Sequence, residues 1–238
     1  DIQLWKELDE VCEEDCRYMT IPHNSNLSSG TMFPSLVDLS EDPFSEYVAY
    51  RSSKEPVMEV FQHKGSSECG PSKIDPECSF EYVPYNNLGV DRFWGLLSRE
   101  PEEEDFLRYA LTEGMVFESH GVENPYKYGV IGSSDTHLGI PGAVDESQFY
   151  GHGGAGKIAQ KEIADVPYFN PGGIVGVWAE ENTRNAIFDA MQRREVFGTS
   201  GPRMKVRLFG SWDFDEKLCG NSENLTIAYA TGVPMGQD

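Results

Sequence analysis

Basic residues are scarce in this sequence. Its 238 residues include 40 Asp and Glu but only 19 Lys and Arg, so the formal net charge is −21. A surface with this excess of negative charge repels the phosphate backbone of DNA and RNA. We therefore expect no nucleic acid among the partners of the protein.

Long hydrophobic runs are also missing. No stretch approaches the roughly 18 consecutive apolar residues that can cross a bilayer, so we expect no membrane span. Hydrophobic residues make up 39% of the chain and aromatic residues 12%, which is more than acidic disordered segments contain. The sequence therefore predicts a folded, acidic chain long enough for one large domain or two small ones.

Three familiar motifs are absent as well. The chain has no G-x-S-x-G turn for acyl transfer, no Walker loop for nucleotide phosphates and no Cys-x-x-Cys pair for structural zinc. Its five cysteines are an odd number, which argues against a complete disulfide framework. Cys69 and Cys78 flank a loop that one disulfide could close, and free buried thiols are the alternative.

Apolar segments of two kinds alternate along the chain. Helical spacing is found over 2–15, 45–51, 106–114 and 182–195, and compact apolar runs typical of strands over 17–21, 56–61, 128–132 and 174–178. The acidic run 102–105 suits the start of the third helix, and Gly114 suits its end. Strands followed by helices predict a parallel α/β sheet or barrel, whose sites lie at the C-terminal ends of the strands.

The tail of the chain has a different pattern. Residues 204–209 and 225–230 alternate between apolar and polar side chains, and no helix is predicted between them. We therefore divide the chain into an α/β unit with inserted loops over 1–203 and a β-rich extension over 204–238.

Polar residues gather directly after three predicted strands, at 22–26, 59–68 and 133–137. Asp135 and His137 are two residues apart, and side chains at i and i+2 of a strand face the same way. A carboxylate and an imidazole that converge in this way form half of a site for zinc, manganese or iron. The alternative is a turn in which Asp135 accepts hydrogen bonds from backbone amides.

The other histidines have weaker context. His23 follows a predicted strand, as Asp135 and His137 do, although a loop histidine bonded to backbone is the common alternative. Alternation from Glu59 places His63 on one side of its strand, and Gln62 and Lys64 on the other. A further histidine, His152, lies in the glycine-rich loop 138–156. It is either exposed to solvent there or makes a contact as part of a lid.

Five segments, spread over nearly the whole chain, carry a family resemblance. They are 21–30, which contains PHNSN, 55–69, 124–137, which ends in SSDTH, 177–184 and 193–203. As a set they resemble domain-of-unknown-function family 3604. That family in turn resembles the polymerase-and-histidinol-phosphatase (PHP) superfamily of distorted, TIM-like β/α barrels. The resemblance implies that residues 1–203 are the later part of such a barrel, followed by extra β-strands.

The same resemblance implies a metal-dependent hydrolase that uses metal-activated water on phosphoesters. PHP proteins hold two or three metal ions, so His23, Asp135 and His137 are implied as ligands of zinc, manganese or iron. The basic side chains of Lys64 and Arg203 are implied to stabilise the anionic group of a small phosphoester substrate. Four residues would support the site from beside it: Asn24, Glu59, Gln62 and Glu68.

One part of the superfamily pattern is missing from the chain. The opening His-x-His has no counterpart, because no histidine precedes His23. Since the chain also begins without Met, we expect that preceding sequence supplies the first half of the barrel. If the metal centre has been lost instead, the chain is a non-catalytic binding or scaffold domain.

Two further expectations concern the reaction and the compartment. A carbohydrate-active hydrolase would need paired acids at strand ends, and Glu59 with Asp135 is the pair that the sequence offers. A disulfide between Cys69 and Cys78, together with the family resemblance, favours a periplasmic or secreted location over the cytoplasm.

Overall fold

The structure is a computed structural model that describes residues 2–38, 44–70, 76–79, 101–137, 139–145, 147 and 170–237. The helices are α1 (Ile2–Val11), α2 (Phe44–Lys54), α3 (Leu107–Ser119), α5 (Arg184–Gln192) and α6 (Asn224–Thr231). The strands are β1 (Val57–Gln62), β2 (Gly65–Ser66), β3 (Gly129–Gly132), β4 (Ile174–Val177), β5 (Val196–Thr199), β6 (Phe209–Gly210) and β7 (Val233–Pro234). None of the described helices is long and apolar enough to cross a membrane.

Three small sheets carry these strands. The first has the order β2-β1-β3, in which β1 pairs antiparallel with β2 and parallel with β3. The pairs β4–β5 and β6–β7 are both antiparallel. The backbone of β5 lies directly against β3, because a Cβ atom added to Gly198 would be 2.6 Å from the carbonyl carbon of Ile131. The parallel pair brings the C-terminal ends of β1 and β3 to one edge, while the predicted PHP-like barrel stays a prediction.

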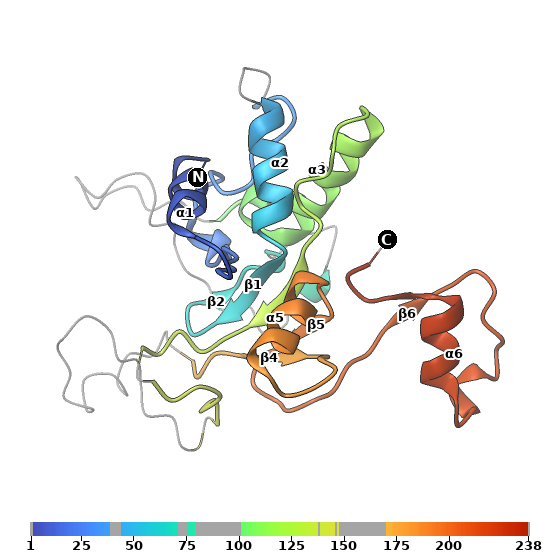
Figure 1. The fold of residues 1–238 in the computed structure, drawn as a ribbon. Coiled ribbons are helices and arrows are strands. Elements are labelled where there is room, and N and C mark those ends of the chain that lie inside the picture. The colour runs from blue at the N-terminus through green and yellow to red at the C-terminus, as the bar shows by residue number, and fades with distance from the viewer. Residues whose placement is uncertain are drawn as a thin grey trace.

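The main hydrophobic core joins the first three helices to the β1–β3 pair. Figure 1 shows α1, α2 and α3 grouped on one side of the molecule, next to β1. Their buried side chains include Trp5 from α1, Val48 from α2 and Phe117 from α3, which pack with Met58 of β1. A smaller cluster of Val57, Ile131 and Val196 ties β5 to the first sheet. Burial of these faces is what the apolar periodicity of the sequence reflects.

A buried arginine fastens α2 to the start of the parallel strands. The Arg51 side chain is 1% exposed, and its Nε lies 3.0 Å from Glu55 Oε2 and donates to Tyr128 Oη at 2.9 Å. Its Nη1 donates to Met32 O at 2.7 Å and to the Tyr47 hydroxyl. These partners compensate for the hydration that the buried charge loses. Because Glu55 lies just before β1 and Tyr128 just before β3, the contacts fix where both strands begin.

Residues 17–21, predicted as a strand, belong to no sheet. Single hydrogen bonds hold this segment beside the end of α2 and the residues after it beside β1. The Thr20 N–H donates to Lys54 O at 2.9 Å, and the Glu59 N–H donates to Pro22 O at 3.0 Å. A strand needs a repeated ladder, and these isolated bonds do not form one.

The helix predicted to end at Gly114 continues to Ser119. A Cβ atom on Gly114 would lie 2.2 Å from Asn124 Oδ1, so the glycine makes room for a packed side chain and does not end the helix. The acidic run precedes α3 as predicted. Residues Glu103–Asp105 form a 3₁₀ turn, and Asp105 accepts a hydrogen bond from the Glu102 N–H at 2.9 Å.

The extension over 204–238 contains both strand and helix. Residues 225–230, predicted as a strand, lie within α6, and the paired strands β6 and β7 have two residues each. Short apolar runs fit either period, and here Ala228 is the buried residue of a helix. Figure 1 shows β6 and α6 set apart from the first sheet.

Two disulfides close short loops. The Cys69–Cys78 bridge is the one that the loop spacing suggested, and Cys12–Cys16 is a second bridge that was not predicted. Residues 2–15 were expected to be one helix, but α1 ends at Val11 and a turn brings the Cα atoms of Cys12 and Cys16 to 5.2 Å. The thiol of Cys219 is free and its residue is exposed.

Candidate functional site

The candidate site lies where β1 and β3 end. Lys64 comes shortly after β1, and Asp135 and His137 come shortly after β3. Because the two strands pair in parallel, the loops that follow them meet at the same edge of the sheet. The segment that begins at residue 170 lies beside these loops, since the Gly173 N–H donates to Ser133 O at 2.6 Å.

The Asp135 carboxylate is the central group of this site. Its Oδ2 forms an ion pair with Lys64 Nζ and lies 3.8 Å from His63 Nε2, and its Oδ1 lies 2.5 Å from His137 Nε2. Burial acts to raise the pKa of this carboxyl group, but the hydrogen bond and charge of Lys64, with smaller contributions from His63 and His137, outweigh burial. The pKa of Asp135 therefore lies below its ordinary value, and the group is an anion at neutral pH.

His63 also belongs to this site, although its sequence context did not predict this. Its ring is fully buried, and Nδ1 donates to Ser134 O at 2.8 Å, which leaves Nε2 facing Lys64 Nζ at 3.1 Å. The side-chain amide of Asn170 donates to the backbone carbonyl of His63 at 3.2 Å. The imidazole is thus held in one tautomer, with its other nitrogen directed at the ammonium and carboxylate groups.

An irregularity in β1 explains why alternation misplaced Gln62, and the turn after β1 explains the position of His63. The register between β1 and β3 shifts between Glu59 and Phe61, so the strand carries an extra residue there. As a result Gln62, three residues after Glu59, hydrogen-bonds to it through Nε2 at 3.0 Å. His63 and Lys64 follow in the two-residue turn between β1 and β2, where strand alternation no longer applies, and both reach Asp135.

A left-handed turn, not strand alternation, brings Asp135 and His137 together. The strand β3 ends at Gly132, and the φ angles of Asp135 and His137 are +49° and +54°. Such angles are uncommon outside glycine and cost of order 1–3 kcal/mol each. Backbone strain of this kind concentrates at ligand-binding and catalytic sites, where neighbouring contacts hold it in place.

A second hydrogen-bond network runs beside the first. The buried carboxylate of Glu59 accepts hydrogen bonds from Ser133 Oγ and Gln62 Nε2. The Asn24 Oδ1 atom accepts from Gln62 Nε2 at 2.6 Å and from His23 Nδ1 at 3.0 Å. In the described residues, the buried Nδ2 of Asn24 has no hydrogen-bond partner. An unpaired buried donor costs roughly 1–3 kcal/mol, so this amide lacks an acceptor that a ligand could supply.

The remaining predicted site residues lie elsewhere. Glu68 forms an exposed ion pair with Arg108 at 2.7 Å, and Arg203 donates to the backbone carbonyl of Gly142 at 3.1 Å. The exposed side chain of His23 reaches the site only through Asn24 among the contacts of the described residues. His152 and most of its glycine-rich loop lie outside the described residues.

The donor types at the site fit a divalent transition metal. The Asp135 carboxylate faces the ring nitrogens of His63 and His137, and carboxylate with imidazole is a donor set that zinc, manganese and iron accept. The number of donors is smaller than such an ion needs, because no three His, Cys, Asp or Glu side chains in the described part of the chain gather closely enough to hold a metal ion. The donor types therefore suit these metals, but the site would need at least one further ligand.

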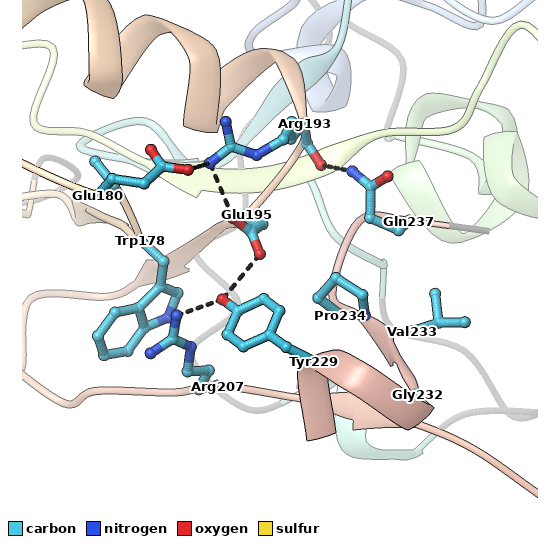
Figure 2. Close-up of a pocket in the computed structure, with 11 residues that line it drawn as sticks. Trp178, Glu180, Arg193, Glu195, Arg207, Tyr229, Gly232, Val233, Pro234 and Gln237 are labelled. Carbon is cyan, nitrogen blue, oxygen red and sulfur yellow. Dashed lines mark hydrogen bonds and ion pairs between the residues drawn. The ribbon is translucent and has the colours of Figure 1, made fainter. Parts of the chain in front are cut away.

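A separate cavity of about 570 Å³ lies between the α5–β5 region and the extension. Figure 2 shows that its charged side chains pair with one another. Arg193 lies 2.8 Å from Glu180 and 3.1 Å from Glu195, Tyr229 donates to Glu195 at 3.0 Å, and Arg207 donates to Tyr229. These contacts fasten the extension to the body of the protein, and we assign no catalytic role to the cavity.

One of three comparisons with known proteins agrees with the resemblance to family 3604. No curated protein and no solved structure shows significant similarity to the chain. The sequence profile of one family, described as "Protein of unknown function (DUF3604)", matches residues 1–238. Since the match covers the whole chain, the protein belongs to the DUF3604 family.

Proposed function

We propose that the protein is a metal-dependent hydrolase of small phosphoesters and that Asp135 is at the centre of its active site. The observation that carries the proposal is the convergence of Lys64, His63, Asp135 and His137 at the ends of two parallel strands. Functional sites of parallel α/β folds lie at this edge. As part of the proposal, residues 1–203 form the later part of a PHP-like barrel.

Asp135 and His137 would hold the metal ion, and His23 would be the third ligand. A divalent ion held there would lower the pKa of a bound water toward neutrality and so supply the nucleophile. The ionised state of Asp135 and the left-handed turn that aims it at His137 both suit a ligand pair. The ion would be zinc, manganese or iron.

The chain itself offers two groups that favour an anionic substrate. The ammonium of Lys64 lies beside Asp135 and its side chain is 23% exposed, so it can contact an oxygen of a phosphoryl group. The unpaired Nδ2 of Asn24 can donate to a second oxygen, with Gln62 and Glu59 holding the amide in place. Arg203, whose exposed side chain donates to the carbonyl of Gly142, has no contact with Asp135 in the described residues and is left out of the proposed substrate contacts.

Hydrolysis of 4-nitrophenyl phosphate and of bis(4-nitrophenyl) phosphate tests this proposal, with zinc, manganese or iron supplied. We expect Asp135→Asn and His137→Gln to abolish turnover of whichever ester the wild type hydrolyses. The matched controls are Asp213→Asn and His120→Gln, which change exposed residues away from Asp135. Turnover that survives in both site variants would contradict the assignment of the active site.

A non-catalytic binding domain is the second candidate, and one observation favours it. The negative charge of Asp135 is already balanced by Lys64 within the chain, which is an arrangement that needs no metal ion. In that case the wild type binds none of the three metals and hydrolyses neither ester. The two disulfides fit a periplasmic or extracellular location for either function.

A further inference from the structure

An exposed basic and apolar segment connects the body of the protein to its extension. We call residues 203–208 the arm. It alternates between basic and apolar side chains, which are Arg203, Met204, Lys205, Val206, Arg207 and Leu208. Figure 1 shows the chain running from the β4–β5 pair out to β6 at this point without a helix or strand of its own.

The apolar side chains of the arm are poorly covered. Met204, Val206 and Leu208 are 59%, 47% and 66% exposed, although alternation puts all three on the same side of an extended chain. A row of exposed apolar side chains is uncommon on a surface unless another molecule covers it. The arm therefore has the side-chain pattern of a strand whose neighbour is missing.

The backbone of the arm is also largely unpaired. Two of its carbonyl groups are used, since Val206 O accepts from Trp178 Nε1 at 2.8 Å and Leu208 O accepts from the Met235 N–H at 2.9 Å. Across the described ranges, no backbone N–H of residues 203–208 has a hydrogen-bond partner. Unpaired N–H groups in an extended segment are a template on which a further strand can form.

The charge of the arm is opposite to that of the protein. Three of the 19 basic residues fall within 203–207, while the whole chain carries −21. Arg207 is fixed against the body, with its guanidinium carbon 4.4 Å from the centre of the Trp178 ring. In the described part of the chain, neither Arg203 nor Lys205 forms an ion pair with a carboxylate. Their charges are available to a partner.

We propose that the arm binds an extended, acidic segment of a partner polypeptide, which adds to it as a strand. The partner's carbonyl groups would accept from the unpaired N–H groups of the arm, and its apolar residues would cover Met204 and Leu208. Its Asp or Glu residues, at alternate positions, would face Arg203 and Lys205. Two arms from two copies of this chain are a poor pair, because their basic residues would lie opposite one another.

A labelled peptide of alternating Val and Glu, Val-Glu-Val-Glu-Val-Glu-Val, is the probe for this surface. Fluorescence anisotropy should show that it binds the full chain, while the same peptide with Lys in place of Glu should not bind. Added salt should weaken the binding, since exposed charges are screened. Hydrogen exchange followed by mass spectrometry should show the amides of 203–208 becoming protected only when the acidic peptide is present.

Matched variants separate the arm from the overall charge. Lys205→Glu should weaken binding of the acidic peptide about tenfold, because the change from attraction to repulsion is worth about 1.4 kcal/mol in total. Lys217→Glu makes the same change in charge at an exposed lysine outside the arm and should leave the affinity within about twofold. For the apolar contact, Leu208→Ser should weaken binding, whereas Leu225→Ser, at a 45% exposed residue of α6, should not.

Three results would overturn the proposal. The first is equal binding of the Lys peptide, or no binding of either peptide. The second is binding of the acidic peptide that leaves exchange at 203–208 unchanged. The third is protection of 203–208 that rises with protein concentration alone and coincides with a dimer in sedimentation velocity, because the occupant would then be a second copy of the chain.

Discussion

Replacing Arg51 by Met tests how the two parallel strands are held. The substitution keeps an unbranched side chain but leaves Glu55, which is 8% exposed, without its cation. It also removes the hydrogen bonds that Arg51 donates to Tyr128 and Met32. Breaking a buried pair in this way costs about 3–5 kcal/mol, because one charge is left unpaired in the core. At about 2–4 °C per kcal/mol, the expected fall in Tm is about 6–20 °C.

Thermal and urea unfolding of three variants would measure this effect. The double variant Arg51→Met/Glu55→Gln should be at least about 1 kcal/mol more stable than Arg51→Met, because no unpaired charge is left behind. Arg108→Met is the matched control, since its pair with Glu68 is exposed and should change stability by about 1 kcal/mol or less. If Arg51→Met lowers stability no more than Arg108→Met does, the reasoning about the buried pair is refuted.

Two further predictions concern the core and the cysteines. Gly114→Ala should lower stability by about 1–3 kcal/mol in thermal unfolding, because its Cβ would meet the Asn124 amide. Gly220→Ala is the control and should have little effect, since the space around Gly220 is open. Equal stability of the two variants would contradict the packing argument. Iodoacetamide should label only Cys219 before reduction and all five cysteines after reduction under denaturing conditions. Intact-mass spectrometry counts the labels, and more than one label before reduction would contradict the two disulfides.

The sequence predicted the elements that bury a continuous apolar face. Trp5 in α1 and Met58 in β1 belong to such faces, and these two elements were found within a few residues of their predicted bounds. Prediction failed where a tertiary contact decided the outcome. Gly114 has the sequence pattern of a helix end, but in the structure it makes room for Asn124 within the helix. The pattern of residues 225–230 fits a strand or a helix, and burial of Ala228 goes with the helix.

The candidate site was predicted in part. The proximity of Asp135 and His137 was expected, but a left-handed turn produces it, and nothing in a single sequence specifies such a turn. The sequence did not predict His63, because it lies in the turn after β1, where strand alternation no longer indicates the direction of a side chain. The clue that could have identified it is its place beside Lys64, at the end of a buried strand in a segment that carried the family resemblance.

The metal content of the purified chain tests the central claim most directly. After incubation with zinc, manganese or iron and removal of the excess, elemental analysis should find at least one equivalent of one of these metals in the wild type. Asp135→Asn and His137→Gln should lose that metal, while Asp213→Asn and His120→Gln should keep it. A folded wild type that retains none of the three metals, or site variants that retain as much as the wild type, would contradict a metal centre at Asp135.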